Sequence, residues 1–216
     1  PYEANNVRRQ SPGLTRTDQS SVSYTPLQNL FGMITTSGLH FERHHQGWVD
    51  IDPRRHRLMI NGLVETPLVF TMEELLRMPS VSRIHCLECG ANTGLEWGNV
   101  AVPTVQYSHG MLSASEFTGV PVSLLLERAG FDRKRATVLL PEGADGSSMT
   151  RTINLENALD DALVSSGQNG EMLRPANGSP LRLLVPGVQG VSWGKLPRRL
   201  GVGHAPWRTQ DAVAHA

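Results

Sequence analysis

Glycine and proline interrupt this chain so often that long helices are disfavoured over most of its length. The 216 residues include 21 glycines and 14 prolines, which end helices and favour turns. The apolar runs between them are short, and one of the longest, Leu181 to Pro186, has only the length of a strand. The sequence therefore predicts short strands and short helices joined by many loops.

The composition indicates one soluble globular domain with no preference for nucleic acid. Hydrophobic residues make up 39% and charged residues 19%, and 20 basic residues balance 20 acidic ones. This balance gives no electrostatic reason to bind nucleic acid or an anionic membrane. No apolar run approaches the ~20 residues of a membrane helix. We expect neither nucleic acid nor membrane as a partner, and an oligomer remains compatible with the composition.

Turn and capping signals divide the chain into strands and helices. Asn61-Gly62 is typical of a hairpin turn, and Thr71 with Glu74 has the spacing of a capping box. Expected strands cover 58–60, 68–70, 81–88, 136–140 and 181–185, and expected helices cover 71–78, 121–130 and 154–163. These elements alternate without a regular βαβ period. We therefore predict an α+β fold of mixed sheets and short helices, with chemistry on loops at strand ends.

Three segments differ in character. Residues 1–40 are polar and weakly periodic, which is typical either of an extended N-terminal arm lying over a core or of a floppy tail. Residues 41–207 carry the periodic elements and form the expected domain. Residues 208–216 are an alanine-rich tail.

The only two cysteines, Cys86 and Cys89, form a C-x-x-C that permits four interpretations. They are too few for a disulfide framework. They could be half of a zinc site, although no second C-x-x-C exists. A thioredoxin-type pair would open a helix, whereas glycine follows here. Two buried thiols are a third interpretation, and one thiolate ligand to a soft transition metal is the fourth. On a strand their odd spacing would place them on opposite faces.

Two basic segments could hold an anion. Arg43-His44-His45 is a dense polar cluster that permits a metal-binding histidine pair, a hydrogen-bonding patch for an anionic ligand, or a solvated loop. The glycine-bearing loop 186–190 runs into Lys195 and then Arg198-Arg199. Such a loop could cradle a phosphate or be an ordinary surface turn. It is neither a Walker loop nor a dinucleotide fingerprint.

Taken together, these segments resemble the molybdopterin-binding domain of the sulfite oxidase family. Cys89-Gly-Ala-Asn92 is similar to the family's cysteine loop, and Arg43-His44-His45 to its first cofactor-contacting segment. The stretch 181–190, followed by Lys195, is similar to the segment that holds the pterin phosphate. The resemblance runs from about Asn6 to Trp207 and implies a sulfite-oxidase-type fold.

Longer phrases resemble one branch of the family, the molybdenum subunits of bacterial sulfane (sulfite) dehydrogenases of the Sox sulfur-oxidation system. These phrases are 37–45, 79–85, 142–145 and 167–171. The resemblance implies a molybdenum-molybdopterin cofactor, with Cys89 as the metal ligand and Cys89 and Arg43 as the catalytic residues. The implied cofactor contacts are Arg43, His44, His45, Cys89, Asp145, Asn177, Arg182, Trp193 and Lys195.

The resemblance also implies a reaction. We expect an oxidoreductase that oxidises the sulfane sulfur of a persulfide on a carrier protein and passes electrons to a c-type cytochrome in the periplasm. Such a cofactor performs the oxygen-atom and electron chemistry, while the protein binds, orients and tunes it. Direct oxidation of sulfite to sulfate is the second hypothesis within this class. Outside the class, the chain could be a truncated, non-catalytic remnant, or a protein that binds no cofactor and keeps its thiols in a core.

Four departures from the family pattern affect these expectations. Sulfite oxidases have an arginine five residues after the cysteine, where this chain has Gly94, so a less positive pocket is expected to favour a sulfane sulfur over free sulfite. Phe117 stands where tryptophan is usual, and Lys195 is followed by leucine and proline rather than tryptophan. No tyrosine follows Tyr107, so the family's active-site tyrosine and its C-terminal dimerisation domain are expected to be absent.

Overall fold

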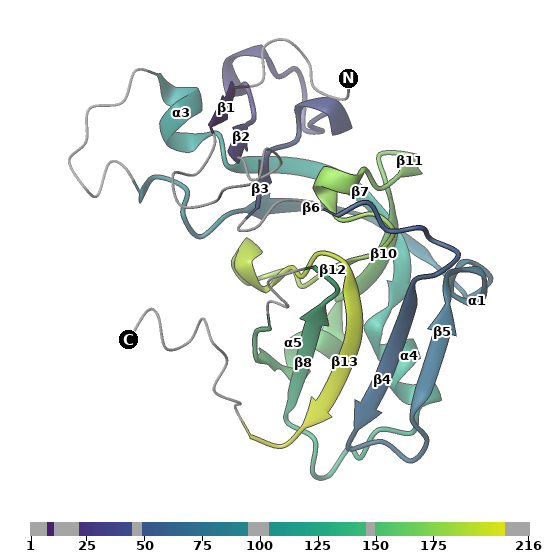
Figure 1. Cartoon of the computed structure of the whole chain (residues 1–216). Coiled ribbons are helices and arrows are strands. Elements are labelled where there is room, and N and C mark those ends of the chain that lie inside the picture. Colours follow the sequence, from purple (N-terminus) through teal and green to yellow (C-terminus); the bar gives the residue numbers. More distant parts are fainter. Residues whose placement is uncertain (1–7, 11–21, 45–48, 95–103, 146–149, 206–216) are drawn as a thin grey trace.

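The chain folds into three β-sheets with short helices at their edges, as a computed structural model shows (Figure 1). The structure describes residues 8–10, 22–44, 49–94, 104–145 and 150–205. The helices are short: α1 is Met72–Leu76, α3 Val105–His109, α4 Val122–Arg128 and α5 Leu155–Asp160. The predicted α+β class with mixed sheets is confirmed. Among the described residues, no helix is both long and apolar enough to span a bilayer.

A small sheet forms the N-terminal part of the described chain. Its strands are β1 (Arg8–Gln10), β2 (Val22–Tyr24) and β3 (Glu42–Arg43), with 3-10 turns at Leu27–Asn29 and Ser37–Leu39 between β2 and β3. β2 is antiparallel to both neighbours and pairs Ser23 with Glu42. This pairing fixes the direction in which the chain leaves β3, and His44, directly after it, lines the cavity described below.

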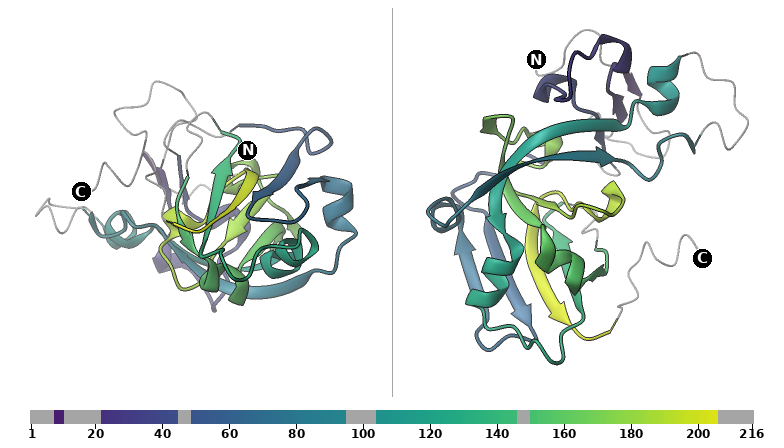
Figure 2. Two further views of the ribbon diagram at one scale, coloured as in Figure 1. Left: turned by 90° about the horizontal axis from the view of Figure 1, so that it is seen from below. Right: turned by 180° about the vertical axis from the view of Figure 1, so that it is seen from behind.

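The central sheet has the order β11-β10-β7-β6, and β12 also pairs with β10. The strands are β6 (Val81–Glu88), β7 (Leu112–Pro121), β10 (Leu163–Gln168), β11 (Glu171–Met172) and β12 (Arg182–Leu184). β6 and β7 form a long curved antiparallel pair that reaches from the N-terminal sheet to the rest of the molecule (Figure 2). The end of β6 therefore lies where the three sheets meet.

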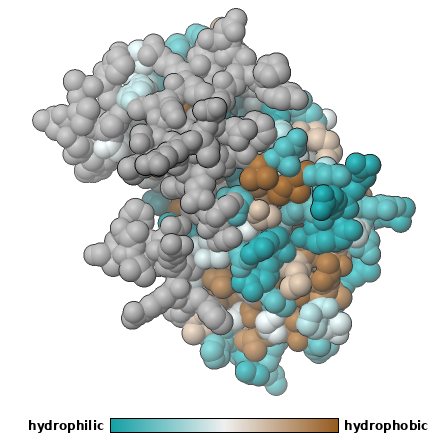
Figure 3. All heavy atoms as spheres, in the orientation of Figure 1, coloured by the Kyte–Doolittle hydropathy of each residue, from teal (hydrophilic) through white to brown (hydrophobic). Residues whose placement is uncertain are grey.

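The third sheet has the order β5-β4-β13-β8-β9. Its strands are β4 (Arg57–Gly62), β5 (Leu68–Thr71), β8 (Val138–Gly143), β9 (Ile153–Asn154) and β13 (Pro197–Gly203). β4 and β13 run parallel. A side chain at Gly62 would place its Cβ 2.1 Å from the Val202 carbonyl oxygen, so only glycine permits this approach. On the face turned to the viewer, hydrophobic residues are interspersed with hydrophilic ones (Figure 3).

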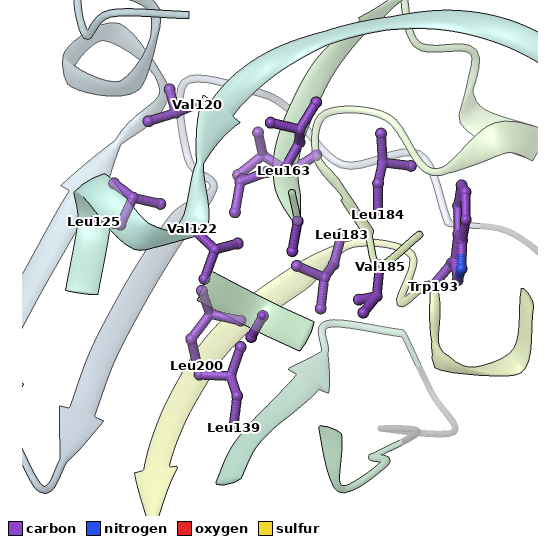
Figure 4. Close-up of a cluster of buried hydrophobic side chains, with 14 of the residues drawn as sticks. Val120, Val122, Leu125, Leu139, Leu163, Leu183, Leu184, Val185, Trp193 and Leu200 are labelled. Atoms are coloured by element: carbon purple, nitrogen blue, oxygen red, sulfur yellow. The ribbon is translucent and has the colours of Figure 1, made fainter. Parts of the chain in front are cut away.

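One hydrophobic core joins the central and third sheets (Figure 4). Val120, Val122 and Leu125 enter it from β7 and α4, and they meet Leu163 of β10 and Leu200 of β13. The core continues to Trp193, which also lines the cavity. Packing of the core therefore fixes one wall of the site.

Several local expectations are confirmed and two need correction. The strand 81–88 is found as expected, and Thr71 caps α1 in a capping box with Glu74. Asn61-Gly62 does not form a two-residue hairpin turn, because both residues extend β4 and pair with β13, while the β4–β5 connection covers 63–67. The helix expected over 154–163 ends at Asp160, because Leu163 begins β10.

Candidate functional site

A cavity of about 560 Å³ opens where the three sheets meet. Four stretches of the chain form its wall: the end of β3, the loop after β6, the region around the end of β8, and the segment from β12 to Lys195. The lining residues are Phe41, Glu42, Arg43, His44, Leu87, Cys89, Gly90, Ala91, Pro141, Gly143, Asp145, Arg151, Arg182, Gln189, Gly190, Val191, Ser192, Trp193, Gly194 and Lys195.

Cys89 reaches the cavity because a tight turn follows β6. The Cys89 backbone N–H donates to the Met111 carbonyl at 3.0 Å, and the Cys89 carbonyl accepts from the Asn92 N–H at 2.9 Å. The Asn92 side chain completes the turn by donating to Glu88 Oε1 at 2.9 Å and accepting from the Met111 N–H at 3.1 Å. Asn92 is buried, so this part of the cysteine loop is held by its own hydrogen bonds.

Cys86 lies on β6 itself and is exposed, whereas Cys89 is half-buried at the cavity. The interpretation of two buried thiols is wrong for Cys86, because β6 is an edge strand and Ser82, Ile84 and Cys86 lie on its exposed face. Both thiols are free. Within the described ranges, no group of three or more histidine, cysteine or acidic side chains could hold a metal.

The segment after β2 brings Arg43 and His44 into the cavity wall, and His45 lies outside the described residues. His44 is buried, and its Nε2 lies 3.0 Å from Oε2 of the equally buried Glu42. A carboxylate can only accept a hydrogen bond, so Nε2 carries the proton and donates. His44 Nδ1 then faces the Lys195 ammonium at 3.5 Å.

Lys195 and Arg182 supply the buried positive charge of the cavity. Lys195 Nζ donates to the Ala176 carbonyl at 2.8 Å and to the Arg43 carbonyl at 3.2 Å. Burial lowers the pKa of Lys195 to about 7, and the nearby Arg182 guanidinium contributes to this lowering of the pKa. Burial also lowers the pKa of Arg182 to about 10. Both shifts express the cost of burying a cation, and for Lys195 the neighbouring cation adds to it.

Asn177 lies behind the wall and does not line the cavity. It is buried, its carbonyl accepts from Arg182 Nη1 at 3.0 Å, and its side-chain amide lies 3.1 Å from His40 Nδ1. Burial, with the Arg182 charge adding to it, lowers the pKa of His40 to about 3, so His40 is neutral at physiological pH. The Asn177 carbonyl therefore supports Arg182, and the direct cofactor contact expected for Asn177 stays a prediction.

Asp145 and Trp193 both line the cavity, as the sequence predicts for cofactor contacts. Asp145 follows β8, and both its side chain and the Lys195 backbone lie beside Gly143. The Trp193 indole N–H donates to the Val188 carbonyl at 3.0 Å, and its ring packs edge-on against Phe117 at 6.4 Å between centroids. Phe117, which replaces the usual tryptophan, thus backs the cavity wall from the core.

Among the lining residues with charged or amide side chains, sequence reasoning missed Glu42, Arg151 and Gln189. Glu42 directly precedes the predicted Arg43-His44 pair, so its position two residues before His44 in an extended segment could have placed both on one face. Gln189 lies over the cysteine loop, because a Cβ on Gly90 would be 3.0 Å from its Oε1. No local signal marks Arg151, which joins the site only through the pairing of β8 with residue 150.

The donor set fits a large anionic cofactor that has one soft metal. Arg182 Nε is buried and has no hydrogen-bond partner among the described residues, although Arg182 lines the cavity. Two buried cations with lowered pKa values gain stability from an anion such as a phosphate. Cys89 offers the single thiol, a ligand type that suits soft transition metals, and Asp145 offers an acceptor for ring N–H groups.

The cavity fits an anionic cofactor with one soft metal, and comparisons with known proteins show to which class of cofactor-binding domain the chain belongs. The sequence matches the family described as oxidoreductase molybdopterin binding domain over residues 45–210. It is 32% identical to an NADH nitrate reductase of Ulva prolifera over 179 residues, 75% of this chain. It is 36% identical to a nitrate reductase of Brassica napus over 188 residues, 78% of this chain. The chain belongs to this molybdopterin-binding family, and its cofactor is molybdenum-molybdopterin.

One solved structure is more similar to this chain than the two nitrate reductases are. The sulfane dehydrogenase SoxCD from Paracoccus pantotrophus superposes with a TM-score of 0.87 at 45% identity, covering 93% of this chain and 51% of that chain. This match also confirms the sulfite-oxidase-type fold. The chain spans about a fifth of the two nitrate reductases, 21% and 20% of their lengths.

Proposed function

We propose that this chain carries the molybdenum site of a sulfane dehydrogenase. Its substrate is the sulfane sulfur of a persulfide on a carrier protein, its electron acceptor is a c-type cytochrome, and it works in the periplasm. The observation that carries the proposal is the 45% identity to the sulfane dehydrogenase of Paracoccus pantotrophus over 93% of this chain. The nitrate reductases are less similar, at 32% and 36% identity.

Each residue of the site has its own role in the proposed reaction. When bound, the cofactor supplies oxygen-atom transfer and accepts electrons. The Cys89 thiolate is its ligand from the protein, Arg182 and Lys195 offset phosphate charge, and Asp145 accepts hydrogen bonds from the pterin. Each oxygen atom added to the sulfur comes from water, and each addition releases two protons and two electrons. The electrons leave one at a time to the cytochrome.

Gly94 supports a substrate that is not a small free anion. It is exposed and does not line the cavity, so the position that carries arginine in sulfite oxidases adds no positive charge here. A persulfide attached to a carrier protein obtains part of its binding energy from contacts outside the cavity. Strong anion binding at Gly94 is therefore unnecessary for that substrate.

The test compares two substrates on the same protein. The chain is purified from a host that makes the cofactor, and its molybdenum content is measured first. Reduction of an oxidised c-type cytochrome is then followed with a carrier-bound persulfide and with free sulfite. We expect reduction with the persulfide and much less with sulfite. A chain holding about one metal that reduces no cytochrome with the persulfide would contradict the proposal.

Direct sulfite oxidation is the second candidate, because the cavity wall contains further cations. Arg43 and Arg151 both line it and are half-buried, and guanidinium groups bind oxyanions well. Cytochrome reduction with free sulfite at a rate above that with the persulfide would favour this function. An Arg43→Met variant would then raise KM for sulfite.

A further inference from the structure

We infer that Glu42 is a positioning residue for the cofactor: its carboxylate holds the His44 imidazole in the orientation that completes the cationic end of the cavity. This role rests on the molybdenum cofactor of the family and is independent of the proposed substrate. No sequence motif pointed to Glu42. The inference comes from two buried side chains, Glu42 and His44, and the half-buried Lys195, which the fold brings into one hydrogen-bonded line.

The geometry of this line is specific. Glu42 Oε2 and His44 Nε2 are 3.0 Å apart, and each side chain is 3% exposed. His44 Nδ1 is 3.5 Å from Lys195 Nζ, across 151 residues of sequence. Glu42 is fixed from behind, because its backbone N–H donates to Ser23 Oγ at 3.2 Å and its strand pairs with β2. All three residues line the cavity.

The donors of Lys195 show where an anion can enter. An ammonium has three N–H donors, and two donate to the Ala176 and Arg43 carbonyls at 2.8 and 3.2 Å. The third faces His44 Nδ1 at 3.5 Å, at the limit of a hydrogen bond. This longest contact is the one that an anionic ligand displaces at least cost. Until an anion takes its place, the imidazole holds this third N–H at the cavity wall, so the position of the imidazole decides where the ammonium points.

Glu42 acts through its hydrogen bond rather than through its charge. The cavity already contains the Asp145 carboxylate, and a phosphate-bearing cofactor adds more negative charge. The negative charge of Glu42 therefore does not by itself favour binding of that cofactor. A hydrogen bond that orients the imidazole does favour it, because partners behind a cofactor's direct contacts typically change its affinity about 10- to 100-fold.

Two conservative substitutions separate the effect of the Glu42 charge from the effect of its hydrogen bond to His44. Glu42→Gln removes the charge but keeps an oxygen that can accept from His44 Nε2. Glu42→Asp keeps the charge but withdraws the oxygens by one methylene, which breaks the 3.0 Å contact. The readout is cofactor retained per chain, as molybdenum by elemental analysis and as pterin by fluorescence after release. We expect near-normal retention in Glu42→Gln and a loss of about tenfold in Glu42→Asp.

Controls make either result decisive. Glu116 on β7 is exposed, so Glu116→Asp and Glu116→Gln should both retain the cofactor. In a His44→Asn background, Glu42→Asp should cause no further loss, because the imidazole through which Glu42 acts is gone. The inference is overturned if Glu42→Gln loses the cofactor, if Glu42→Asp folds and retains it, or if the two changes are additive. Should Glu42→Asp fail to fold, Glu42→Met, which cannot accept from His44 Nε2, takes its place: loss of the cofactor supports the role of Glu42, and retention overturns it.

The result is separable from the proposed substrate. Cofactor content is measured without any substrate or cytochrome, so a chain inactive on persulfide can still support the role of Glu42. Conversely, normal retention in both Glu42 variants would overturn this role and leave the proposed oxidation of sulfane sulfur intact.

Discussion

The two cysteines of C-x-x-C occupy different environments, and this difference decides their expected roles. Cys89 is half-buried beside the glycine loop of the cavity, and Cys86 is exposed three residues earlier on β6. A soft metal held in the cavity can bind the Cys89 thiolate, whereas Cys86 does not line the cavity. Around Cys89, the buried cations Arg182 and Lys195 make the cofactor-free cavity unfavourable and the loaded cavity favourable.

Cys89→Ser is expected to abolish molybdenum-dependent activity and to lower the metal content, because a hydroxyl is a harder and weaker ligand than a thiolate. Cys86→Ser is the matched control. Since Cys86 is exposed, the free energy of unfolding should change by less than about 0.5 kcal/mol, and the metal content should stay normal. Elemental analysis and urea unfolding check both variants. Metal loss in Cys86→Ser alone would reverse the assignment.

Lys195 is expected to make the stability of the cofactor-free protein depend on pH. Its pKa is about 7 in the folded protein and about 10.4 in an unfolded chain. Between these values the unfolded chain binds more protons, so the free energy of unfolding rises with pH, by at most about 1.4 kcal/mol per pH unit. The free-energy cost of burying the Lys195 cation is present in full below about pH 7 and disappears above the pKa that Lys195 has in the unfolded chain.

The measurement is urea unfolding of cofactor-free wild type and Lys195→Met across this pH window. The increase with pH should be smaller in Lys195→Met, which has no proton to lose. Cofactor loading should also flatten the wild-type curve, because a bound phosphate raises the pKa of Lys195. Identical pH dependence in both cofactor-free proteins would show that Lys195 is not buried as a cation.

At the scale of elements, the loop before Lys195 packs against the end of β6, directly before Cys89. A Cβ on Gly190 would lie 2.5 Å from the Glu88 carbonyl oxygen and 2.8 Å from Leu87 Cδ1. The loop therefore approaches the end of β6 as closely as a bare backbone allows. This contact sets the separation of the thiol from the phosphate-binding residues.

Gly190→Ala should destabilise the cofactor-free protein by about 1–3 kcal/mol, because the added methyl forces the loop away from β6. Gly194→Ala, in the same segment, is the control, since its nearest neighbour would be Leu183 Cβ at 4.0 Å. Gly194→Ala should change the free energy of unfolding by no more than about 0.5 kcal/mol. Thermal unfolding of both proteins tests the difference. Equal melting temperatures would mean that the loop moves freely against the strand.

At the scale of the whole molecule, the cavity depends on all three sheets. Glu42 and His44 come from the N-terminal sheet, Cys89 from the central one, and Gly143 and Asp145 from the third. A ligand that contacts all these walls stabilises their arrangement as a unit. Parts of the fold that face away from the cavity gain no direct contact.

Hydrogen exchange should therefore slow on cofactor loading in the separate segments 41–44, 89–92 and 189–195 together. The β4–β5 pair, residues 57–62 and 68–71, serves as the internal control and should change little, because none of its residues lines the cavity. Exchange measured by mass spectrometry on loaded and cofactor-free protein makes the comparison. Protection confined to one of the three segments would show that the walls bind independently.

The success of the sequence prediction followed the strength of local signals. The strand 81–88, with β-branched residues before the cysteine loop, and the Thr71–Glu74 capping box are visible in the sequence and present in the structure. β7 was not predicted, because its buried face carries Ser113 and Ser115, which form hydrogen bonds to Thr25 and Gln168 instead of an apolar stripe. β13 contains two arginines and two glycines and gives no strand pattern.

The sequence by itself determined the class of fold and the family and predicted the residue types of the site, because short motifs and their order can be read without coordinates. Only the tertiary structure decided that Cys86 is exposed, that Asn177 stands behind Arg182, and that Glu42 joins His44 and Lys195. These outcomes depend on contacts between residues far apart in the chain, such as the 151 residues that separate His44 and Lys195. Sequence periodicity carries no information at that separation.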